Sequence, residues 1–528
     1  MADTVKYPIG EQDFKSLIEM GCLYVDKTQY IEKIISSGHK YYFLARPRRF
    51  GKSLFLSSLQ YFFKGRRELF KGLYIDSTDW DWKPYPVLRL DLNTEKYEVP
   101  GLLDSLLDNT FKKWEKEYGI QETAETLSTR FQNIIATAHE KTGRQVVILV
   151  DEYDKPLVGN LNVDETFEHY QAKLASVYSN FKSSAEHIRL VFLTGVSRFS
   201  KLSIFSDLNN IRDITFVNEF SDICGITEKE LLDNFKEGIR AFAEENEISY
   251  EETYGLLKKN YDGYRFAKTG SDIYNPWSVL NAMQDRSISN YWGRSGKATI
   301  IAEALKNVDA DLEGILTSIV SMYTLEGLDL KSANPVALLY QTGYITIKDY
   351  DFESDYVTLG VPNLEVRQSL FDDLLPYYVK TRRSTADLVV QNIIMDLRTG
   401  KPEKFVKDLD IFLAGIPYEM KMDDENNLHN ALFILLTLLG VAVETEVHTS
   451  DGRIDLVVKT PKFIYIIELK FDKSAEEAMT QIEQKQYSLP YANDPRRLFK
   501  LGLNFSSTTR HLDTPRICTT MKDNYTQK

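Results

Sequence analysis

Cysteine is scarce in this sequence. Its three cysteines, Cys22, Cys224 and Cys518, are scattered along the chain and form no Cys-x-x-Cys pair. Their spacing excludes a disulfide framework and the usual zinc ribbons. We therefore expect a protein of the reducing cytoplasm.

Long hydrophobic runs are also missing. The longest apolar stretch, ALFILLTLLG at 431–440, is much shorter than the ~20 residues that cross a bilayer. The first ten residues, MADTVKYPIG, contain no apolar segment of the kind found in signal peptides. We predict that the protein neither spans nor crosses a membrane, and that 431–440 is a buried helix.

Positive charge is not in excess, since the formal net charge is -13. This excludes a uniformly basic coat for nucleic acid but leaves room for a local basic groove. The 528 residues are too many for one hydrophobic core, and 43% hydrophobic with 27% charged residues is typical of folded globular proteins. Several folded domains are expected.

One stretch, FLARPRRFGKSLFLSSL at 43–59, has the order of a phosphate-binding P-loop (Walker A). A strand-like run, 41–45, precedes Gly51-Lys52-Ser53, which opens a helical pattern. In such loops main-chain N–H groups cradle the phosphates, the lysine reaches the β and γ phosphates, and the hydroxyl binds Mg²⁺. Arg46 stands where the first glycine is normal, and Arg46, Arg48 and Arg49 add positive charge that would suit a polyphosphate, a DNA backbone or a solvated loop.

A second motif follows the apolar run Val146–Val150, which is typical of a buried parallel strand. It ends in Asp151-Glu152, at the sheet edge where α/β folds place their chemistry. Asp151 would hold Mg²⁺ (Walker B) and Glu152 would polarise the attacking water. The alternative to a catalytic role is that Asp151 and Glu152 are two acidic residues in a surface loop.

Two further runs, 86–93 and 188–198, complete a predicted sheet. The second ends in polar residues, of which Thr194 or Ser197 would sense the γ-phosphate or simply cap the strand. Arg198 and Arg265 are candidate arginine fingers, on weaker grounds.

Six motifs together resemble the AAA-ATPase-like family of bacterial proteins that carry a C-terminal nuclease-like domain. They are YVDKT at Tyr24, RPRRFGKS at Arg46, VDEYDKP at Val150, TGVSRFS at Thr194, YDGYRF at Tyr261 and YNPWSVL at Tyr274. The resemblance covers most of the chain and implies that an arginine in place of the first glycine is a family variant of a nucleotide site. It implies ATP and Mg²⁺ as ligands. An arginine supplied by a neighbouring copy would make the protein a homo-oligomer, but an ATPase can also work as a monomer.

The middle of the chain predicts a helical lid, starting at a capping box of Thr227 and Glu230. The segment GRSGKAT at 293–299 lacks a preceding strand and is interpreted as a turn. Farther on, 343–363 predicts a β-hairpin with an acidic tip at 349–355, as in a winged-helix-like module. Because acidic residues repel phosphates, we favour a structural or protein-contact role over DNA binding.

The second chemical cluster lies in 452–487, which predicts two strands, a Thr-Pro-Lys turn and an amphipathic helix. Asp455 interrupts the first strand, and Glu468 and Lys470 share a face of the second. Charges on apolar strands are costly unless they pair or bind metal. These residues therefore fit either a Mg²⁺ site, with Lys470 orienting a water, or a structural ion-pair cluster.

The order of a helix acid, a strand Asp, Glu-x-Lys and a helix Gln resembles the PD-(D/E)XK nuclease superfamily. The resemblance assigns Asp455, Glu468 and Lys470 to catalysis, with Glu425 and Gln481 in support. His429, Glu444 and Glu446 are left as possible neighbours, and Tyr487 flanks the helix.

The sequence thus predicts an α/β protein in four parts. They are an AAA-like P-loop ATPase domain (1–222), a helical lid (223–300), a winged-helix-like middle region (301–410) and an α/β restriction-endonuclease-like domain (411–528). We expect ATP hydrolysis to regulate a Mg²⁺-dependent nuclease acting on nucleic acid, DNA above RNA, in DNA processing or defence against foreign DNA. The alternative is an ATP-dependent switch whose nuclease-like domain is catalytically silent.

Overall fold

The chain folds into two units, and each unit is made of two separate segments of the chain. The computed structural model describes residues 5–95, 97, 99, 101–121, 126–160, 163–198, 210–293, 312–326, 334–378, 383–414, 434–435, 444–450 and 453–520. The first unit contains Met1–Arg294 and Leu316–Glu365, and the second contains Ser295–Ile315 and Val366–Lys528. The division falls inside the expected middle region 301–410, because the hairpin module packs with the first unit.

A parallel sheet forms the centre of the first unit. Its strands lie in the order β2-β3-β4-β1-β5, and every neighbouring pair is parallel. The bounds are β1 (Tyr41–Ala45), β2 (Val87–Asp91), β3 (Val146–Asp151), β4 (Ile188–Gly195) and β5 (Arg212–Asp213). The central strands β1, β3 and β4 are buried almost throughout, as unbroken apolar runs predict for strands covered on both faces.

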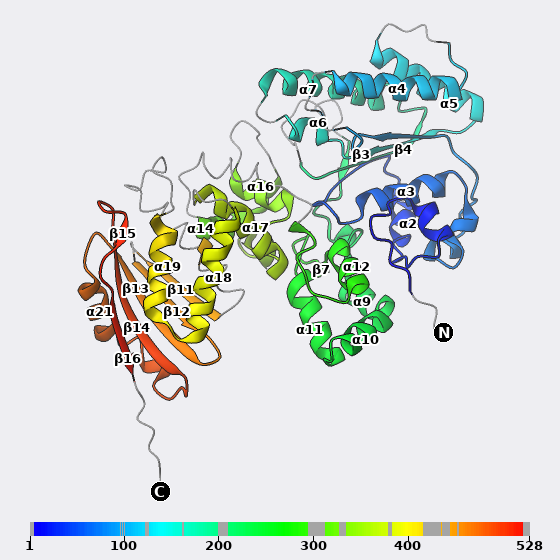
Figure 1. Ribbon diagram of the computed structural model, residues 1–528. Coiled ribbons are helices and arrows are strands. Elements are labelled where there is room, and N and C mark those ends of the chain that lie inside the picture. Colours follow the sequence, from blue (N-terminus) through cyan, green and yellow to red (C-terminus); the bar gives the residue numbers. More distant parts are fainter. Residues whose placement is uncertain are drawn as a thin grey trace. The chain divides into compact units, whose positions relative to one another are not determined.

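Helices cover both faces of this sheet. Figure 1 shows α3 on one side of β3 and β4, and α4, α5 and α7 on the other. The helices are α1 (Phe14–Glu19), α2 (Gln29–Ser36), α3 (Lys52–Phe63), α4 (Leu102–Glu117), α5 (Leu127–Thr142), α6 (Lys155–Val158), α7 (Asp164–Tyr178) and α8 (Asn180–Ser183). The predicted order of strand, loop and helix around 41–63 is confirmed.

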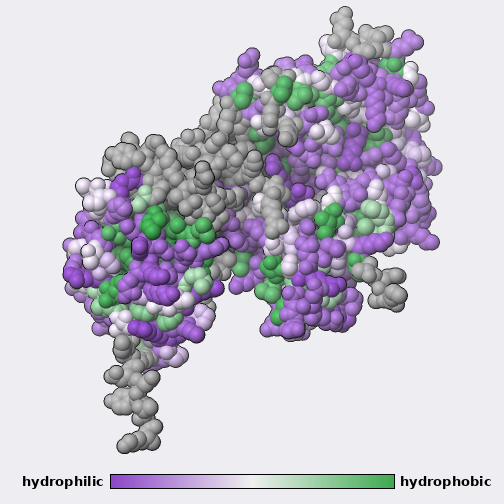
Figure 2. Space-filling view, in the orientation of Figure 1, coloured by the Kyte–Doolittle hydropathy of each residue, from purple (hydrophilic) through white to green (hydrophobic). Residues whose placement is uncertain are grey.

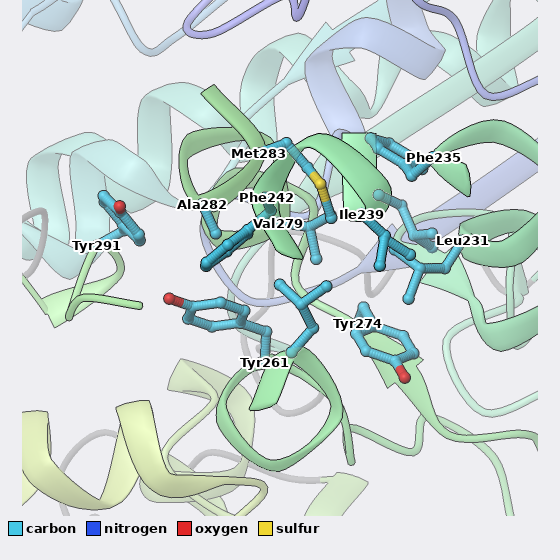
Figure 3. Packing of buried hydrophobic residues seen from close by; sticks show 12 residues of the cluster. Leu231, Phe235, Ile239, Phe242, Tyr261, Tyr274, Val279, Ala282, Met283 and Tyr291 are labelled. Atoms are coloured by element: carbon cyan, nitrogen blue, oxygen red, sulfur yellow. The ribbon is translucent and has the colours of Figure 1, made fainter. Parts of the chain in front are cut away.

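A helical subdomain follows the sheet. It consists of β6 (Ile226–Thr227), α9 (Glu228–Asn234), α10 (Lys236–Glu245), α11 (Tyr250–Tyr261), β7 (Ile273–Tyr274) and α12 (Pro276–Asp285). The predicted capping box is confirmed, since Thr227 and Glu230 each accept a hydrogen bond from the other's main-chain N–H. Apolar faces of these helices meet in one core, drawn in Figure 3, while their outer surface is mostly hydrophilic in Figure 2.

A small antiparallel sheet completes the first unit. Its strands β8 (Ile319–Ser321), β10 (Tyr356–Gly360) and β9 (Thr346–Asp351) lie in that order, and α15 (Met322–Glu326) and α16 (Pro335–Thr342) come between β8 and β9 in the chain. The predicted hairpin at 343–363 is thereby confirmed. Apart from Gly293, the expected turn at 293–299 lies outside the described residues.

The second unit is built on a mixed sheet. Strands β11 (Glu444–Ser450), β12 (Arg453–Lys459) and β13 (Phe463–Phe471) form an antiparallel meander. Helix α21 (Ala475–Gln484) then crosses to β14 (Arg497–Ser506), which runs parallel to β13. Strands β15 (His511–Leu512) and β16 (Arg516–Thr520) pair with β14. The predicted strand, turn, strand and helix of 452–487 are confirmed.

Alternate residues of β13 show that helices cover both faces of this sheet. Ile464 and Ile466 pack with Ile482 of α21, whereas the Tyr465 hydroxyl donates to the carbonyl of Leu397. Leu397 belongs to α18 (Arg383–Thr399), which packs against α19 (Pro402–Ala414) (Figure 1). Both helices are part of the second unit, although α18 and the first residues of α19 lie before the expected domain start at 411.

The core of the helical subdomain offers a stability test with its own control. Leu257 on α11 is fully buried, and its neighbour Leu256 is 38% exposed. Leu257→Ala should lower the free energy of unfolding by about 2–5 kcal/mol, and Leu256→Ala by less than about 1 kcal/mol. Urea unfolding followed by tryptophan fluorescence reports on the first unit, because all five tryptophans lie there: Trp80, Trp82, Trp114, Trp277 and Trp292. Equal losses for the two variants would contradict this packing.

Candidate functional site

The loop between β1 and α3 has the backbone that a phosphate site needs. Gly51 precedes the first residue of α3 with φ +94°, and Arg49 has φ +72°, so the chain turns sharply twice before the helix begins. Left-handed conformations of this kind suit glycine and strain other residues. The turn leaves the N–H groups of the first helical turn at the end of the loop, where anions bind well.

Lys52 is held inside this loop. Its side chain is only 4% exposed, and its ammonium group donates to the carbonyls of Arg46 (3.0 Å) and Pro47 (3.2 Å). The same group lies 3.2 Å from a carboxylate oxygen of Glu152. A buried ammonium must be paired, so an incoming phosphate would replace Glu152 as the partner of Lys52.

Asp151 lies at the carboxyl end of β3, beside the loop. It is buried, accepts a hydrogen bond from the Thr194 hydroxyl (2.8 Å), and lies 3.3 Å from the Arg89 guanidinium. Burial raises the pKa of this carboxyl, although the Thr194 hydrogen bond opposes the shift. The structure therefore brings Asp151 and Thr194 together from adjacent parallel strands.

Glu152 has the left-handed conformation, with φ +53°. This backbone costs of the order of 1 kcal/mol or more for a residue with a side chain. Its carboxylate meets Lys52, across the edge of the sheet. The pair of acids is therefore part of the loop's own environment, and not an isolated surface turn.

Asp154 is a residue whose role the sequence analysis did not recognise. It is fully buried and accepts hydrogen bonds from the main-chain N–H groups of Val196 (3.1 Å) and Ser197 (2.6 Å). The Tyr153 hydroxyl donates to the carbonyl of Ser197 (3.0 Å). Asp154 thereby fixes the segment that follows Thr194, and the VDEYDKP motif already contained the signal in its third acid.

Three arginines from the sequence analysis have structural partners. Arg46 is buried, donates to the carbonyls of Ala45, Thr215, Phe220 and Ser221, and lies over the Phe266 ring. The Arg46 guanidinium faces the protein interior, so we do not include Arg46 among the residues that would bind phosphate.

Arg198 and Arg265 also pair within the first unit. Arg198 bonds Asp213 (2.7 Å), while Arg265 bonds Asp272 (2.9 Å) and the carbonyl of Lys348 (2.9 Å). Neither guanidinium is directed to the Lys52 loop by a contact that the described residues show. We therefore do not use either as an arginine finger.

Arg49 and Ser53 lie at the loop itself. Arg49 is exposed, and its guanidinium lies 4.1 Å from the centre of the Trp277 ring, at the start of α12. Ser53 is half-buried in the first turn of α3. Both residues thus lie at the loop between β1 and α3.

An apolar cavity of about 90 Å³ opens beside Gly51. Its walls come from the N-terminal segment, from α3 and from the helical subdomain. Among the lining residues are Pro8, Val25, Leu54, Cys224, Phe235 and Leu280.

The second candidate site lies on β13. Glu468 is fully buried and Lys470 is 4% exposed, and the Lys470 ammonium lies 2.5 Å from one Glu468 oxygen. Lys470 also donates to the Gln481 side chain on α21 (2.6 Å). The other Glu468 oxygen, Oε2, is buried and has no hydrogen-bond partner among the residues that the structure describes. An unpaired buried carboxylate oxygen is costly, and a cation is a partner that would satisfy it.

Asp455 stands directly opposite Glu468 in the pairing of β12 with β13. Directly opposite positions of an antiparallel pair lie on the same face of a sheet, so position 455 shares the face on which Glu468 lies. The side chain of Asp455 is not among the described ones, and Glu425 and His429 lie outside the described residues, as do the side chains of Glu444 and Glu446. Within the described residues, no cluster of three or more His, Cys, Asp or Glu side chains could hold a metal ion.

Gly502 explains how α21 reaches this site, and sequence analysis missed it. It pairs with Glu468 across β13 and β14. A side chain at 502 would put its first carbon 2.5 Å from the Ala475 carbonyl oxygen and 2.7 Å from the Met479 nitrogen. Only glycine lets α21 pack so closely that Gln481 meets Lys470.

Comparison with known proteins matches both halves of the chain. A family model described as Predicted AAA-ATPase matches residues 8–205, and one described as PD-(D/E)XK nuclease superfamily matches residues 423–514. A protein of Azotobacter chroococcum mcd 1, described as an uncharacterized protein in the vnfD 5' region, is 32% identical over 527 residues. The alignment covers 96% of this chain and 97% of that relative.

The fold and the two sites define a class of protein in which a P-loop-like α/β unit precedes a nuclease-like unit. The chain belongs to the family of AAA-ATPase-like proteins that carry a C-terminal PD-(D/E)XK nuclease-superfamily domain. The described helices include none that is long and apolar enough to span a membrane.

The titration of Asp154 gives a pH test of its burial. Burial raises the pKa of Asp154 from 3.8 to about 6, so between these values the folded protein keeps a proton that the unfolded chain has lost. The free energy of unfolding should therefore fall as pH rises through this window, and Asp154→Asn should remove that contribution. Relative to wild type, the variant should gain about 2–3 kcal/mol between pH 4 and pH 6.5, measured by urea unfolding. A difference that stays constant with pH would refute the assignment.

Proposed function

We propose that the first unit binds and hydrolyses ATP. The observation that carries this proposal is the meeting of Lys52, Asp151, Glu152 and Thr194 at one edge of the parallel sheet. Main-chain N–H groups at the start of α3 would hold the phosphates, and Lys52 would exchange Glu152 for the β and γ phosphates. Ser53 and Asp151 are the oxygen donors suited to Mg²⁺.

Glu152 and Thr194 would act on the reacting groups. Once Lys52 turns to the phosphates, the Glu152 carboxylate is free to orient and polarise the attacking water. Thr194, whose loop is fixed by Asp154, would contact the γ-phosphate. Arg49, exposed at the loop, would neutralise phosphate charge.

The apolar cavity beside Gly51 would receive the adenine base. It adjoins the start of α3, so a base there would remain connected to phosphates at the loop. Its walls include residues of the helical subdomain, such as Phe235 and Leu280. Binding of the base would therefore bring that subdomain into contact with the nucleotide.

We further propose that the second unit hydrolyses phosphodiester bonds of nucleic acid, with DNA as the favoured substrate. The supporting observation is the unpaired buried oxygen of Glu468, on the same sheet face as Asp455. Oxygen donors of this kind fit Mg²⁺, which when bound supplies positive charge to the substrate phosphate. Lys470, held by Glu468 and Gln481, would orient the attacking water and stabilise negative charge on the phosphate.

ATP turnover would then control cleavage, as the fusion of the two units in one chain suggests. A place in DNA processing or in defence against foreign DNA agrees with that combination by analogy. A second candidate is an ATP-dependent switch with a silent nuclease-like unit. It is favoured by the Lys470 contacts, since a lysine satisfied by Glu468 and Gln481 also fits a purely structural ion pair.

Two substitutions separate the proposed activities. Lys52→Ala should lower ATP hydrolysis at least ~100-fold, and Glu468→Gln should abolish Mg²⁺-dependent cleavage while ATP hydrolysis stays within about twofold of wild type. The assay is cleavage of a mixed DNA and RNA panel with and without ATP, alongside phosphate release. ATP-dependent binding without cleavage in the wild type would support the silent switch. Loss of both activities in Glu468→Gln would contradict the division of labour.

Filling the apolar cavity tests the base site. Leu54 lines the cavity, and Leu54→Trp should raise the KM for ATP at least ~10-fold with kcat little changed, because bulk there obstructs the base and spares the reacting groups. Leu54→Met keeps the side-chain volume and serves as the control. An unchanged KM in Leu54→Trp would place the base elsewhere.

A further inference from the structure

A buried carboxylate outside both sites draws together three parts of the first unit. Glu365 is only 3% exposed, and its Oε1 accepts hydrogen bonds from the main-chain N–H groups of Tyr291 (2.7 Å) and Trp292 (2.9 Å). Its Oε2 accepts from the hydroxyl of Ser278 on α12 (2.7 Å). Both oxygens of this carboxyl group therefore have partners within the first unit, although burial raises its pKa from 4.5 to about 7.

Glu365 also has a special position in the chain. It is the second residue of α17 (Leu364–Tyr378), and the chain passes into the second unit directly after it. Its partner Trp292 lies two residues before Arg294, where the chain first leaves the first unit. One carboxylate therefore joins two of the points at which the units are connected.

One arm of contacts leads from Glu365 to the start of the phosphate loop. Trp292 packs edge-on against Tyr344, with ring centres 4.9 Å apart. The preceding residue, Gly343, has φ +90°, and a side chain there would put its first carbon 2.7 Å from Cβ of Pro47. Pro47 thus lies directly against Gly343.

A second arm leads to the other side of the same loop. Ser278 follows Trp277, whose ring lies under the Arg49 guanidinium at 4.1 Å. The Trp277 indole N–H donates to the carbonyl of Tyr291 (3.3 Å), which binds the two arms to each other. Pro47 and Arg49 both lie in the segment that leads to Lys52, so two residues of the loop are linked to Glu365.

Binding of a phosphate would change the contacts of the loop. The Lys52 ammonium bonds the carbonyl of Pro47 and faces Glu152, and a phosphate at the loop would compete for it. If Pro47 or Arg49 moved, it would press on Gly343 or on the Trp277 ring, which are closely packed. Closely packed groups pass a displacement on to their neighbours. These contacts end at the first turn of α17.

We propose that Glu365 is a positioning residue that couples nucleotide occupancy of the Lys52 loop to α17, and through α17 to the nuclease-like unit. This rests on the ATP site proposed above. A purely structural Glu365 would affect stability alone, whereas a coupling residue must also carry a nucleotide-dependent signal.

The test is hydrogen exchange of full-length protein with and without ATP and Mg²⁺. In the wild type, nucleotide should change the exchange rates of amides in α17 by at least ~10-fold. In Glu365→Ala this change should fall below about twofold while the affinity for ATP stays within about threefold. Glu365→Gln should retain the response, because its carbonyl oxygen can still accept from Tyr291 and Trp292.

Further variants allow the proposal to be tested even if Glu365→Ala does not fold. Ser278→Ala removes the α12 arm alone and should reduce the α17 response about threefold, so it replaces Glu365→Ala if that variant does not fold. Glu251→Ala, at an exposed position of α11, is the matched control and should respond as wild type does. Cleavage with and without ATP is the second readout, and its ratio should approach one in Glu365→Ala.

The outcomes separate the two proposals. A wild type that binds ATP without any change in α17 overturns the coupling and leaves the ATP site standing, as does a Glu365→Ala protein that responds fully. A wild type that does not bind ATP overturns the nucleotide site and the coupling with it.

Discussion

The partnering of buried charges is the constraint on which this structure depends. Lys52, Asp151 and Arg46 in the first unit, and Glu468 and Lys470 in the second, are all nearly inaccessible to water. An isolated buried charge costs several kcal/mol, so each needs a partner of opposite charge or a set of hydrogen bonds. The proposed sites lie at two of these charges: Lys52 is paired with Glu152, and one oxygen of Glu468 has no hydrogen-bond partner among the described residues.

Arg46 shows the opposite use of the same constraint. It occupies the position at which a P-loop normally has its first glycine, yet its guanidinium turns inward to main-chain carbonyls between Thr215 and Ser221. Such a residue cannot move without leaving a charge unpaired. The arginine therefore fastens the loop to the sheet's neighbouring segment, and the turn comes from Arg49 and Gly51 instead.

In the second unit the sheet decides which charges meet. Antiparallel pairing puts Asp455 opposite Glu468, and parallel pairing puts Gly502 on the other side of Glu468. The missing side chain of Gly502 admits α21, which brings Gln481 to Lys470. A cluster from two strands and a helix thus depends on one residue that takes no part in the chemistry.

The sequence by itself determined the local elements and the candidate chemistry. Apolar runs marked β1, β3 and β4, alternation marked the hairpin, and the capping box marked α9, because each of these signals depends on residues within a few positions of one another. Only the tertiary structure decided which polar residues are held within the protein. Arg46, Arg198 and Arg265 were candidates for contacting phosphate in the sequence, and Asp154, Gly502 and Glu365 passed unnoticed. Most of their partners lie tens to more than a hundred residues away, as Ser221 does from Arg46. Burial and pairing over such separations are set by the packing of whole elements, which no local pattern encodes.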